Sequence, residues 1–555
     1  MSAAGNAVRR ALESLDVRHA FGLPGERNLG LYDALRGSSV RLVVPTHELA
    51  AAFMAQGYAR STGAVGVVLA IPGPGLAYTL AGLVEAQHDS APLLVLTGAP
   101  REGGGAFPLQ RFDQAAVLAP VVKRVLRVGA DADVEAAVRG AHELARSGEP
   151  GPVVVELAEG SREADRPEEA PPEAPSAEPD ERAVEAVARR LLAARRPVVL
   201  TGQGAAGAAA GVRRLVARTG AAVLATTSGR GVVPEDDPRS LVVDAPGHGA
   251  DATNALLAEA DLVLALGCKL SHNGTLGYAL ILDPERLVHV DASDASLAAG
   301  GASTPVRADV QAFVAALEGR LPDGAERGWS DDELDRHRRA LGAEAATADR
   351  TEPVLRGLGD GSPQAFFAAL RAALPRDGVI VTDSGLHQQL ARRHFRVLEP
   401  RTLLVPADFQ SMGFGLPAAI GAAHATPGRP VVAVVGDGGF ALSGLELLTA
   451  VRDRLPLTVV VLVDGHLGLI RLEQLARYGR PTAVETAVPD LGLLARSVGA
   501  RHQRLEGDAE AILRESVQAG APTLLELVAD DPPRLRGLRA VGGARRVVRG
   551  LRRRG

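Results

Sequence analysis

Residues 430–465, PVVAVVGDGGFALSGLELLTAVRDRLPLTVVVLVDG, decide the fold. An apolar, β-branched run leads into the turn Gly436-Asp437-Gly438-Gly439, a helical pattern follows to Pro456, and a second apolar run ends at Asp464. Strand, glycine-rich turn, helix and strand in this order predict a right-handed crossover in a parallel sheet. The two strands deliver Asp437 and Asp464 to the same carboxyl edge of that sheet.

The same order of elements occurs in residues 65–98, VGVVLAIPGPGLAYTLAGLVEAQHDSAPLLVLTG. The first turn glycine and the proline before the second strand are similarly spaced in both stretches, Gly73 to Pro92 and Gly436 to Pro456. The repeat indicates two related domains of one fold, and a chance likeness between two βαβ units is the alternative.

Composition narrows the class of protein. The chain has 555 residues, enough for three or four domains, and its 46% hydrophobic and 23% charged content excludes wholesale disorder. One cysteine excludes a disulfide framework and a cysteine zinc site, and a net charge of −5 gives no support for a nucleic-acid partner. No apolar run of about 18 residues exists, so no membrane partner is expected. The N-terminus reads as an amphipathic helix rather than a signal peptide, so the expected location is cytoplasmic.

Two polar, proline- or glycine-broken segments divide the chain as predicted linkers, residues 159–182 and 321–362. Each remaining block alternates short Val/Leu runs with helical patterns, which predicts an α/β fold of three doubly wound parallel-sheet domains, residues 1–158, 183–320 and 363–530. Residues 531–555 form a basic C-terminal tail. A disordered or lid-like tail is favoured over nucleic-acid binding, because no aromatic residues are interleaved for stacking.

Asp437 and Asp464 are the first candidates for chemistry. Two carboxylates beside a glycine-rich turn and a helix N-terminus suit one hard cation, Mg²⁺, bound together with a diphosphate. The alternative is that both are solvated turn formers, but their place at the ends of two apolar strands favours the metal site.

The GDG turn followed by strand and Asp resembles the thiamine-diphosphate motif of the acetolactate synthase and pyruvate decarboxylase superfamily. Four further segments read in family order: 21–35 (FGLPGERNLGLYDAL), 45–60 (PTHELAAAFMAQGYAR), 72–75 (PGPG) and 412–423 (MGFGLPAAIGAA). The chain is most similar to acetolactate synthase large-subunit-like proteins. The resemblance implies a pyrimidine-binding, a central Rossmann-like and a diphosphate-binding domain, with thiamine diphosphate and Mg²⁺ as cofactors. It also implies a homodimer or homotetramer with sites between subunits.

The resemblance assigns roles to individual residues. Glu48 stands where the family's activating glutamate bonds the pyrimidine N1′, so that N4′ removes the thiazolium C2 proton; a helix-start glutamate stabilised by the helix dipole is the alternative. Met412 matches the apolar residue that props the cofactor in its bent form. The metal ligands are Asp437, Asp464 and the His466 carbonyl. The other cofactor-binding positions are Pro24, Gly385, His387, Gln388, Gly436, Gly438 and Gly439; as an alternative, His387 caps a surface helix.

Fewer residues indicate which enzyme type of this superfamily the chain resembles. Gln110, ahead of Pro120-Val121-Val122-Lys123, resembles the glutamine that contacts substrate in acetolactate synthases, although an exposed loop amide is the alternative. Glu26 stands where pyruvate decarboxylases carry an aspartate, and is either a proton relay or part of the N-cap region of the next helix. The histidine pair of pyruvate decarboxylases is missing. The tryptophan that shapes the second-substrate pocket of acetolactate synthases is Glu473 here.

The central block contains a GxGxxG match at residues 202–207. The acidic residue expected about 20 positions later in a nicotinamide site is missing, so a tight strand–helix turn is the better interpretation. Acetolactate synthases bind FAD in this domain through an arginine-containing segment. The corresponding residues 267–274 lack the arginine, which argues against FAD.

Together these features predict a thiamine-diphosphate- and Mg²⁺-dependent enzyme. It decarboxylates a 2-oxo acid and ligates the remaining enamine to a second carbonyl compound. The alternatives are a 2-oxo-acid decarboxylase that releases an aldehyde, and a non-catalytic cofactor-binding paralogue.

Overall fold

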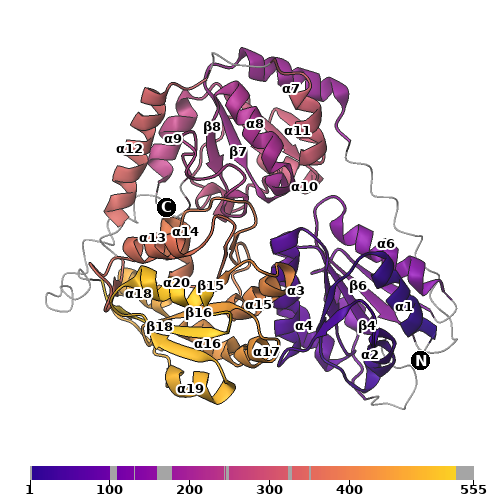
Figure 1. Ribbon diagram of the computed structural model, residues 1–555. Helices are drawn as coiled ribbons and strands as arrows, with labels where there is room; N and C mark the ends of the chain where they lie inside the picture. The colour runs from indigo at the N-terminus through magenta and orange to yellow at the C-terminus, as the bar shows by residue number, and fades with distance from the viewer. Residues whose placement is uncertain are drawn as a thin grey trace. The chain divides into compact units, whose positions relative to one another are not determined.

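The computed structural model describes residues 3–99, 109–129, 132–158, 178–242, 244, 249–322, 328–348 and 352–532 (Figure 1). Most of the predicted linker 159–182 and the tail from residue 533 onward lie outside these ranges. Within them, every helix is too short or too polar to cross a membrane. The secondary structure confirms the predicted α/β class with three sheets.

The first sheet has six parallel strands in the order β2-β1-β3-β4-β6-β5. Its strands are β1 (His19–Gly22), β2 (Arg41–Val43), β3 (Gly66–Leu69), β4 (Leu93–Gly98), β5 (Arg124–Val128) and β6 (Pro152–Leu157). The helices of this segment are α1 (Ala3–Ser14), α2 (Leu29–Leu35), α3 (Glu48–Thr62), α4 (Pro74–His88), α5 (Gln114–Leu118) and α6 (Val134–Arg146). The central strands are unbroken Val/Leu runs because a parallel sheet is covered on both faces.

The second sheet has five parallel strands in the order β11-β10-β9-β7-β8. Its strands are β7 (Pro197–Thr201), β8 (Ala222–Ala225), β9 (Leu262–Leu266), β10 (Leu287–Asp291) and β11 (Thr304–Arg307). The helices are α7 (Glu181–Ala193), α8 (Ala209–Thr219), α9 (Ala250–Glu259), α10 (Asp294–Gly300), α11 (Val310–Glu318) and α12 (Asp331–Ala348). The last of these, α12, lies within the predicted linker 321–362.

The GxGxxG turn after β7 packs directly against the backbone at Gly267. A Cβ atom on Gly202 would lie 1.9 Å from the carbonyl oxygen of Gly267, and one on Gly204 would lie 2.9 Å from the Cα of Gly267. Glycine is therefore required at both positions for close packing against the end of β9, as a tight strand–helix turn demands.

The third sheet runs β12-β18-β16-β15-β13-β14, with β17 beside β18, and only β12 is antiparallel to its neighbour. Its strands are β12 (Val354–Leu355), β13 (Val379–Thr382), β14 (Leu403–Leu404), β15 (Val431–Gly436), β16 (Leu457–Val463), β17 (Arg501–Arg504) and β18 (Thr523–Asp530). The helices of this segment are α13 (Pro363–Ala373), α14 (Leu386–His394), α15 (Gly415–Ala425), α16 (Asp437–Ser443), α17 (Leu447–Arg452), α18 (Gly468–Tyr478), α19 (Leu491–Val498) and α20 (Ala509–Gln518).

The described residues group into two compact units, called unit one and unit two below. Unit one falls within Met1–Ser176, Pro406–Arg429 and Leu445–Leu455, and therefore contains the first sheet together with α15 and α17. Unit two contains the second and third sheets.

Helices α3 and α15 both belong to unit one, although some 360 residues separate them in the sequence. They pack against each other, and Figure 1 shows them side by side. A Cβ on Gly57 would lie 2.0 Å from the Ala418 carbonyl oxygen, and one on Gly421 would lie 1.9 Å from that of Met54. The two backbones can approach this closely only because both positions are glycine. Since the later residue on α3 meets the earlier one on α15, the two helices run antiparallel.

Candidate functional site

Two carboxylates of unit two meet at the carboxyl edge of the third sheet. Strand β15 ends at Gly436 and pairs with Leu462 of β16, so Asp437 and Asp464 follow neighbouring strand ends. Asp437 Oδ2 accepts hydrogen bonds from the backbone N–H groups of Gly465 (2.7 Å) and Asp464 (3.2 Å). Asp464 Oδ1 in turn accepts one from the His466 N–H at 2.8 Å. The predicted juxtaposition of these residues is therefore present in the structure.

The electrostatics of this pair suit a cation. Burial raises the pKa of Asp437, and burial followed by the charge of Asp437 raises the pKa of Asp464 to about 6. Within the described residues, no cluster of three or more acidic, histidine or cysteine side chains could hold a metal ion. The protein thus offers two carboxylates and the nearby His466 carbonyl. That donor set fits Mg²⁺ if phosphate oxygens and water complete its octahedral shell.

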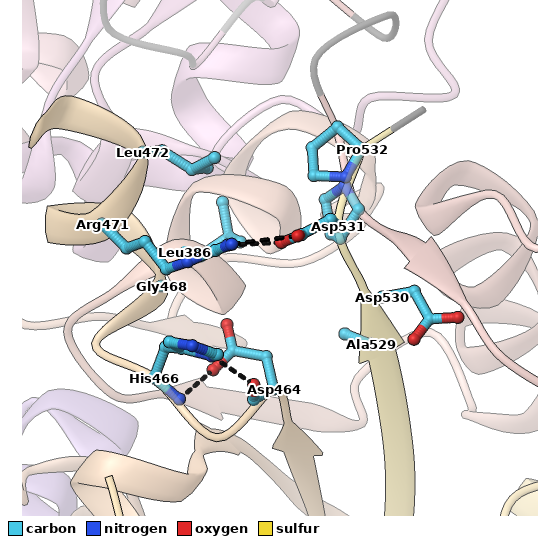
Figure 2. A pocket seen from close by; sticks show the side chains of 11 residues that line it. Leu386, Asp464, His466, Gly468, Arg471, Leu472, Ala529, Asp530, Asp531 and Pro532 are labelled. Carbon is cyan, nitrogen blue, oxygen red and sulfur yellow. Dashed lines mark hydrogen bonds and ion pairs between the residues drawn. The ribbon is translucent and has the colours of Figure 1, made fainter. Parts of the chain in front are cut away.

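A pocket of about 230 Å³ opens beside Asp464 and His466 (Figure 2). One of its walls is the ion pair between Arg471 on α18 and Asp531, in which Nη2 donates to Oδ2 at 2.9 Å. Leu386, the first residue of α14, also lines it. The pocket therefore has walls formed both by the predicted metal ligands Asp464 and His466 and by the start of α14, next to the loop expected to contact the diphosphate.

His387 lies in that loop region and is buried, which contradicts the alternative that it caps a surface helix. Burial lowers the pKa of its imidazole to about 4, so the ring is neutral at physiological pH. Its Nε2 is buried and has no hydrogen-bond partner among the described residues. A Cβ on Gly436 would lie 3.0 Å from its Nδ1, so the glycine turn leaves room for the ring.

The neighbouring cofactor candidates share this environment. Gly385 has φ +143°, a conformation that favours glycine, and directly precedes α14, on which Gln388 is buried. A Cβ on Gly439 would lie 2.5 Å from Asp383 Oδ2, so this position also requires glycine. Gly438 is half-buried in the first turn of α16. An unpartnered imidazole nitrogen and a turn of small residues fit a diphosphate group.

Glu48 belongs to unit one and begins α3, after the N-cap residue His47. The carboxyl group faces the start of α4, because a Cβ on Gly75 would lie 2.9 Å from its Oε1. Burial and the charge of Glu48 raise the pKa of Tyr32. Two residues before Glu48, the Thr46 N–H donates to the buried carboxylate of Glu446 on the segment leading into α17, at 2.9 Å.

A residue that the sequence reasoning missed, Gln114, holds the PGPG turn beside Glu48. Its side-chain oxygen accepts from the N–H of Gly73 at 2.7 Å, and its Nε2 donates to the buried Glu156 at 2.8 Å. The predicted substrate residue Gln110 packs on the same turn through its backbone, since a Cβ on Gly73 would lie 2.4 Å from its carbonyl oxygen. Gln114 stands on a five-residue helix without periodic pattern, so the sequence carried no signal for it.

The lysine of the Pro-Val-Val-Lys segment has a structural role. Lys123 Nζ donates to the carbonyl oxygens of Leu144 (2.7 Å), Ser147 (2.6 Å) and Glu149 (2.8 Å), at the C-terminal end of α6. A cation there satisfies carbonyl groups that the helix itself leaves unpaired.

Pro24 and Glu26 are exposed and lie at the 3-10 turn Glu26–Asn28 before α2. The carboxylate of Glu26 makes no hydrogen bond or ion pair within the described residues. Both interpretations of Glu26 therefore stay predictions.

Met412 is 38% exposed in the loop before α15. The antiparallel packing of α15 on α3 puts this loop near the C-terminal end of α3, whereas Glu48 begins that helix. Glu48 and Arg60 stand twelve residues apart, which is about 18 Å at 1.5 Å per residue. One chain therefore does not bring Glu48 and Met412 together.

Comparison with known proteins identifies the family to which the chain is similar. Three family models match: the N-terminal TPP binding domain of thiamine pyrophosphate enzymes at residues 2–117, their central domain at 184–317 and their C-terminal TPP binding domain at 383–527. The chain is 29% identical to the probable acetolactate synthase large subunit of Methanocaldococcus jannaschii, over 94% of this chain and 91% of that protein.

Two further relatives have names that indicate different activities. Acetolactate synthase 1, chloroplastic, of Zea mays is 30% identical over 96% of this chain and 86% of its own length. Probable 2-ketoarginine decarboxylase AruI of Pseudomonas aeruginosa is 33% identical over 94% of this chain and 93% of its own length.

Proposed function

Because the chain belongs to the thiamine pyrophosphate enzyme family, we propose that it is an acetolactate synthase-like carboligase. It takes a 2-oxo acid, releases CO₂ and transfers the remaining fragment to a second carbonyl compound. The observation that carries the proposal is the buried Asp437 next to the half-buried Asp464, beside a glycine turn and an unpartnered imidazole nitrogen. When bound there, thiamine diphosphate supplies a carbon nucleophile and an electron sink.

The residues of unit two hold the cofactor in this proposal. Asp437, Asp464 and the His466 carbonyl bind Mg²⁺, and the cation binds the diphosphate. His387 borders the diphosphate as a neutral imidazole, and a hydrogen bond to the backbone of Asp383 orients its ring.

The residues of unit one act on the other end of the cofactor. Glu48 holds a proton at its carboxyl group against the pyrimidine N1′, which makes the N4′ amine a base. The close approach of Gly75 fixes the Glu48 carboxyl group on one side. Gln110, whose backbone packs on the same turn, faces the substrate. The proposal includes no FAD, because residues 267–274 lack the arginine of the FAD-binding segment.

We infer that the working site combines two copies of the chain. Glu48 and Met412 must both lie near one bent cofactor, yet within a chain they stand near opposite ends of α3, about 18 Å apart. A second copy removes this conflict by supplying one of the two residues. The proposed enzyme is therefore a homodimer or a homotetramer.

A mixing experiment tests the shared site. Glu48→Gln and Asp437→Ala chains are each expected to be inactive. If each site takes Glu48 from one chain and Asp437 from another, refolding the two variants together restores activity in mixed dimers, because one of their two sites is intact. If both residues come from one chain, the mixture stays inactive.

Mass spectrometry of products tests the reaction. Purified protein is incubated with thiamine diphosphate, Mg²⁺ and pyruvate, with Glu48→Gln as the matched control. Acetolactate supports the proposal. Acetaldehyde alone contradicts it and makes the enzyme a decarboxylase. If neither product forms, a panel of 2-oxo acids is tested, including 2-ketoarginine because the name of one relative contains it. The absence of any product from the whole panel favours a non-catalytic paralogue.

A further inference from the structure

Helix α4 ends in two buried carboxyl groups that bind the backbone of the Met412 loop. The Asp89 carboxylate accepts from the N–H groups of Ala407 (3.2 Å) and Asp408 (3.2 Å). Glu85 Oε2 accepts from the N–H of Ser411 at 2.8 Å. All of these residues belong to unit one, and Met412 directly follows Ser411.

The two buried carboxyl groups lie close to the guanidinium group of Arg60. Arg60 on α3 donates from Nη1 to Asp89 Oδ2 at 2.7 Å, with both side chains almost completely buried. Glu85 is fully buried one helical turn before Asp89, and its Oε1 has no hydrogen-bond partner within the described residues. Burial, and next the charge of Asp89, raise the pKa of Glu85 to about 8. At neutral pH Glu85 is therefore mostly a neutral acid beside the Arg60–Asp89 ion pair.

The loop itself has a conformation that needs such support. Gln410 and Gly413 both have positive φ, +66° and +83°. The Met412 side chain between them is 38% exposed, so packing against its own unit fixes it only in part. The backbone hydrogen bonds to α4 are thus a main constraint on where this side chain lies.

We propose that Glu85 and Asp89 are positioning residues that hold the Met412 loop through three backbone N–H groups, and so set the bent form of the bound cofactor. The inference rests on the proposed function for Met412. It predicts different behaviour for two conservative variants. Glu85→Gln keeps a neutral acceptor for Ser411. Asp89→Asn loses one of the two acceptor oxygens and turns N–H donors toward the loop amides.

The first measurement uses the protein without cofactor. Hydrogen–deuterium exchange of residues 406–414 is expected to quicken about tenfold or more in Asp89→Asn and in Glu85→Ala, since each loses hydrogen bonds to the loop. Glu85→Gln is expected to match the unmodified protein. Val138→Ala, a cavity in the core beside α6 in the same unit, is the control for lost stability without a contact to the loop.

The second measurement uses bound thiamine diphosphate with Mg²⁺. Exchange of its C2 proton is expected to slow about tenfold or more in Asp89→Asn and Glu85→Ala, while cofactor affinity, which unit two sets, stays within about threefold. Glu85→Gln restores the normal rate. Unchanged loop exchange, or a normal C2 rate in Asp89→Asn, overturns the inference. If the unmodified protein binds no cofactor or shows no C2 exchange, the proposed function fails, and the loop measurement still decides whether the carboxyl groups hold the loop.

Discussion

Replacing Glu85 with glutamine is expected to stabilise the protein at alkaline pH and to leave it unchanged at acidic pH. Burial raises the pKa of Glu85 from 4.5 to about 8 in the folded state. Between these values the folded chain keeps a proton that the unfolded chain has lost. Raising the pH therefore favours unfolding by about 1.4 kcal/mol per pH unit. Glutamine does not titrate, and it keeps the hydrogen bond from Ser411.

The size of the stability difference between the two proteins follows from the pH interval between these two pKa values. At about pH 5 the two proteins differ by less than about 1 kcal/mol, and by about pH 8.5 the variant is more stable by several kcal/mol, roughly 4–5 if the whole shift is expressed. Urea unfolding of the cofactor-free protein, followed by circular dichroism at several pH values, measures the gap. A gap independent of pH would refute the protonated Glu85. Val138→Ala, which removes no titrating group, is the control, and its gap is expected to stay the same at every pH.

Three other substitutions test the site. Glu48→Gln is expected to slow C2–H exchange of the bound cofactor at least about a hundredfold, because the variant loses the proton held at N1′. The Mg²⁺-dependent affinity for the cofactor is expected to stay largely intact. An unchanged exchange rate would contradict the role of Glu48. Asp437→Ala is expected to weaken thiamine diphosphate binding in Mg²⁺ about tenfold or more by calorimetry, and undiminished affinity removes it from the metal site. Gly75→Ala is expected to slow C2–H exchange about tenfold, since the new Cβ would lie 2.9 Å from Glu48 Oε1; a normal rate means the carboxyl group is not confined there.

Local patterns in the sequence predicted the sheets and one half of the site. Apolar runs ending at Gly436 and Val463 gave two parallel strands, and strand length alone put Asp437 and Asp464 at one edge. The glycine-rich turn was predicted in the same way, and a Cβ atom on Gly436 or Gly439 would lie within 3.0 Å of His387 or Asp383.

The other half depends on contacts between residues far apart in the chain. Glu85, Asp89, Gln114 and Glu446 read as ordinary polar residues of helices or turns, since helical periodicity does not distinguish a buried carboxyl group from a solvated one. Only the tertiary structure buries them and supplies their partners. These are Arg60 and the loop before α15 for Asp89 and Glu85, Glu156 of β6 for Gln114, and Thr46 for Glu446.

The sequence by itself determined the α/β class, the three sheets and the family, because these follow from periodicity and from turns whose chemistry is local. The tertiary structure decided which buried carboxyl group keeps its proton, since that depends on desolvation and on charges brought in from distant segments. It also decided that Glu48 and Met412 stand near opposite ends of α3. The antiparallel approach of two helices sets that separation, and the close contacts at Gly57 and Gly421 fix it.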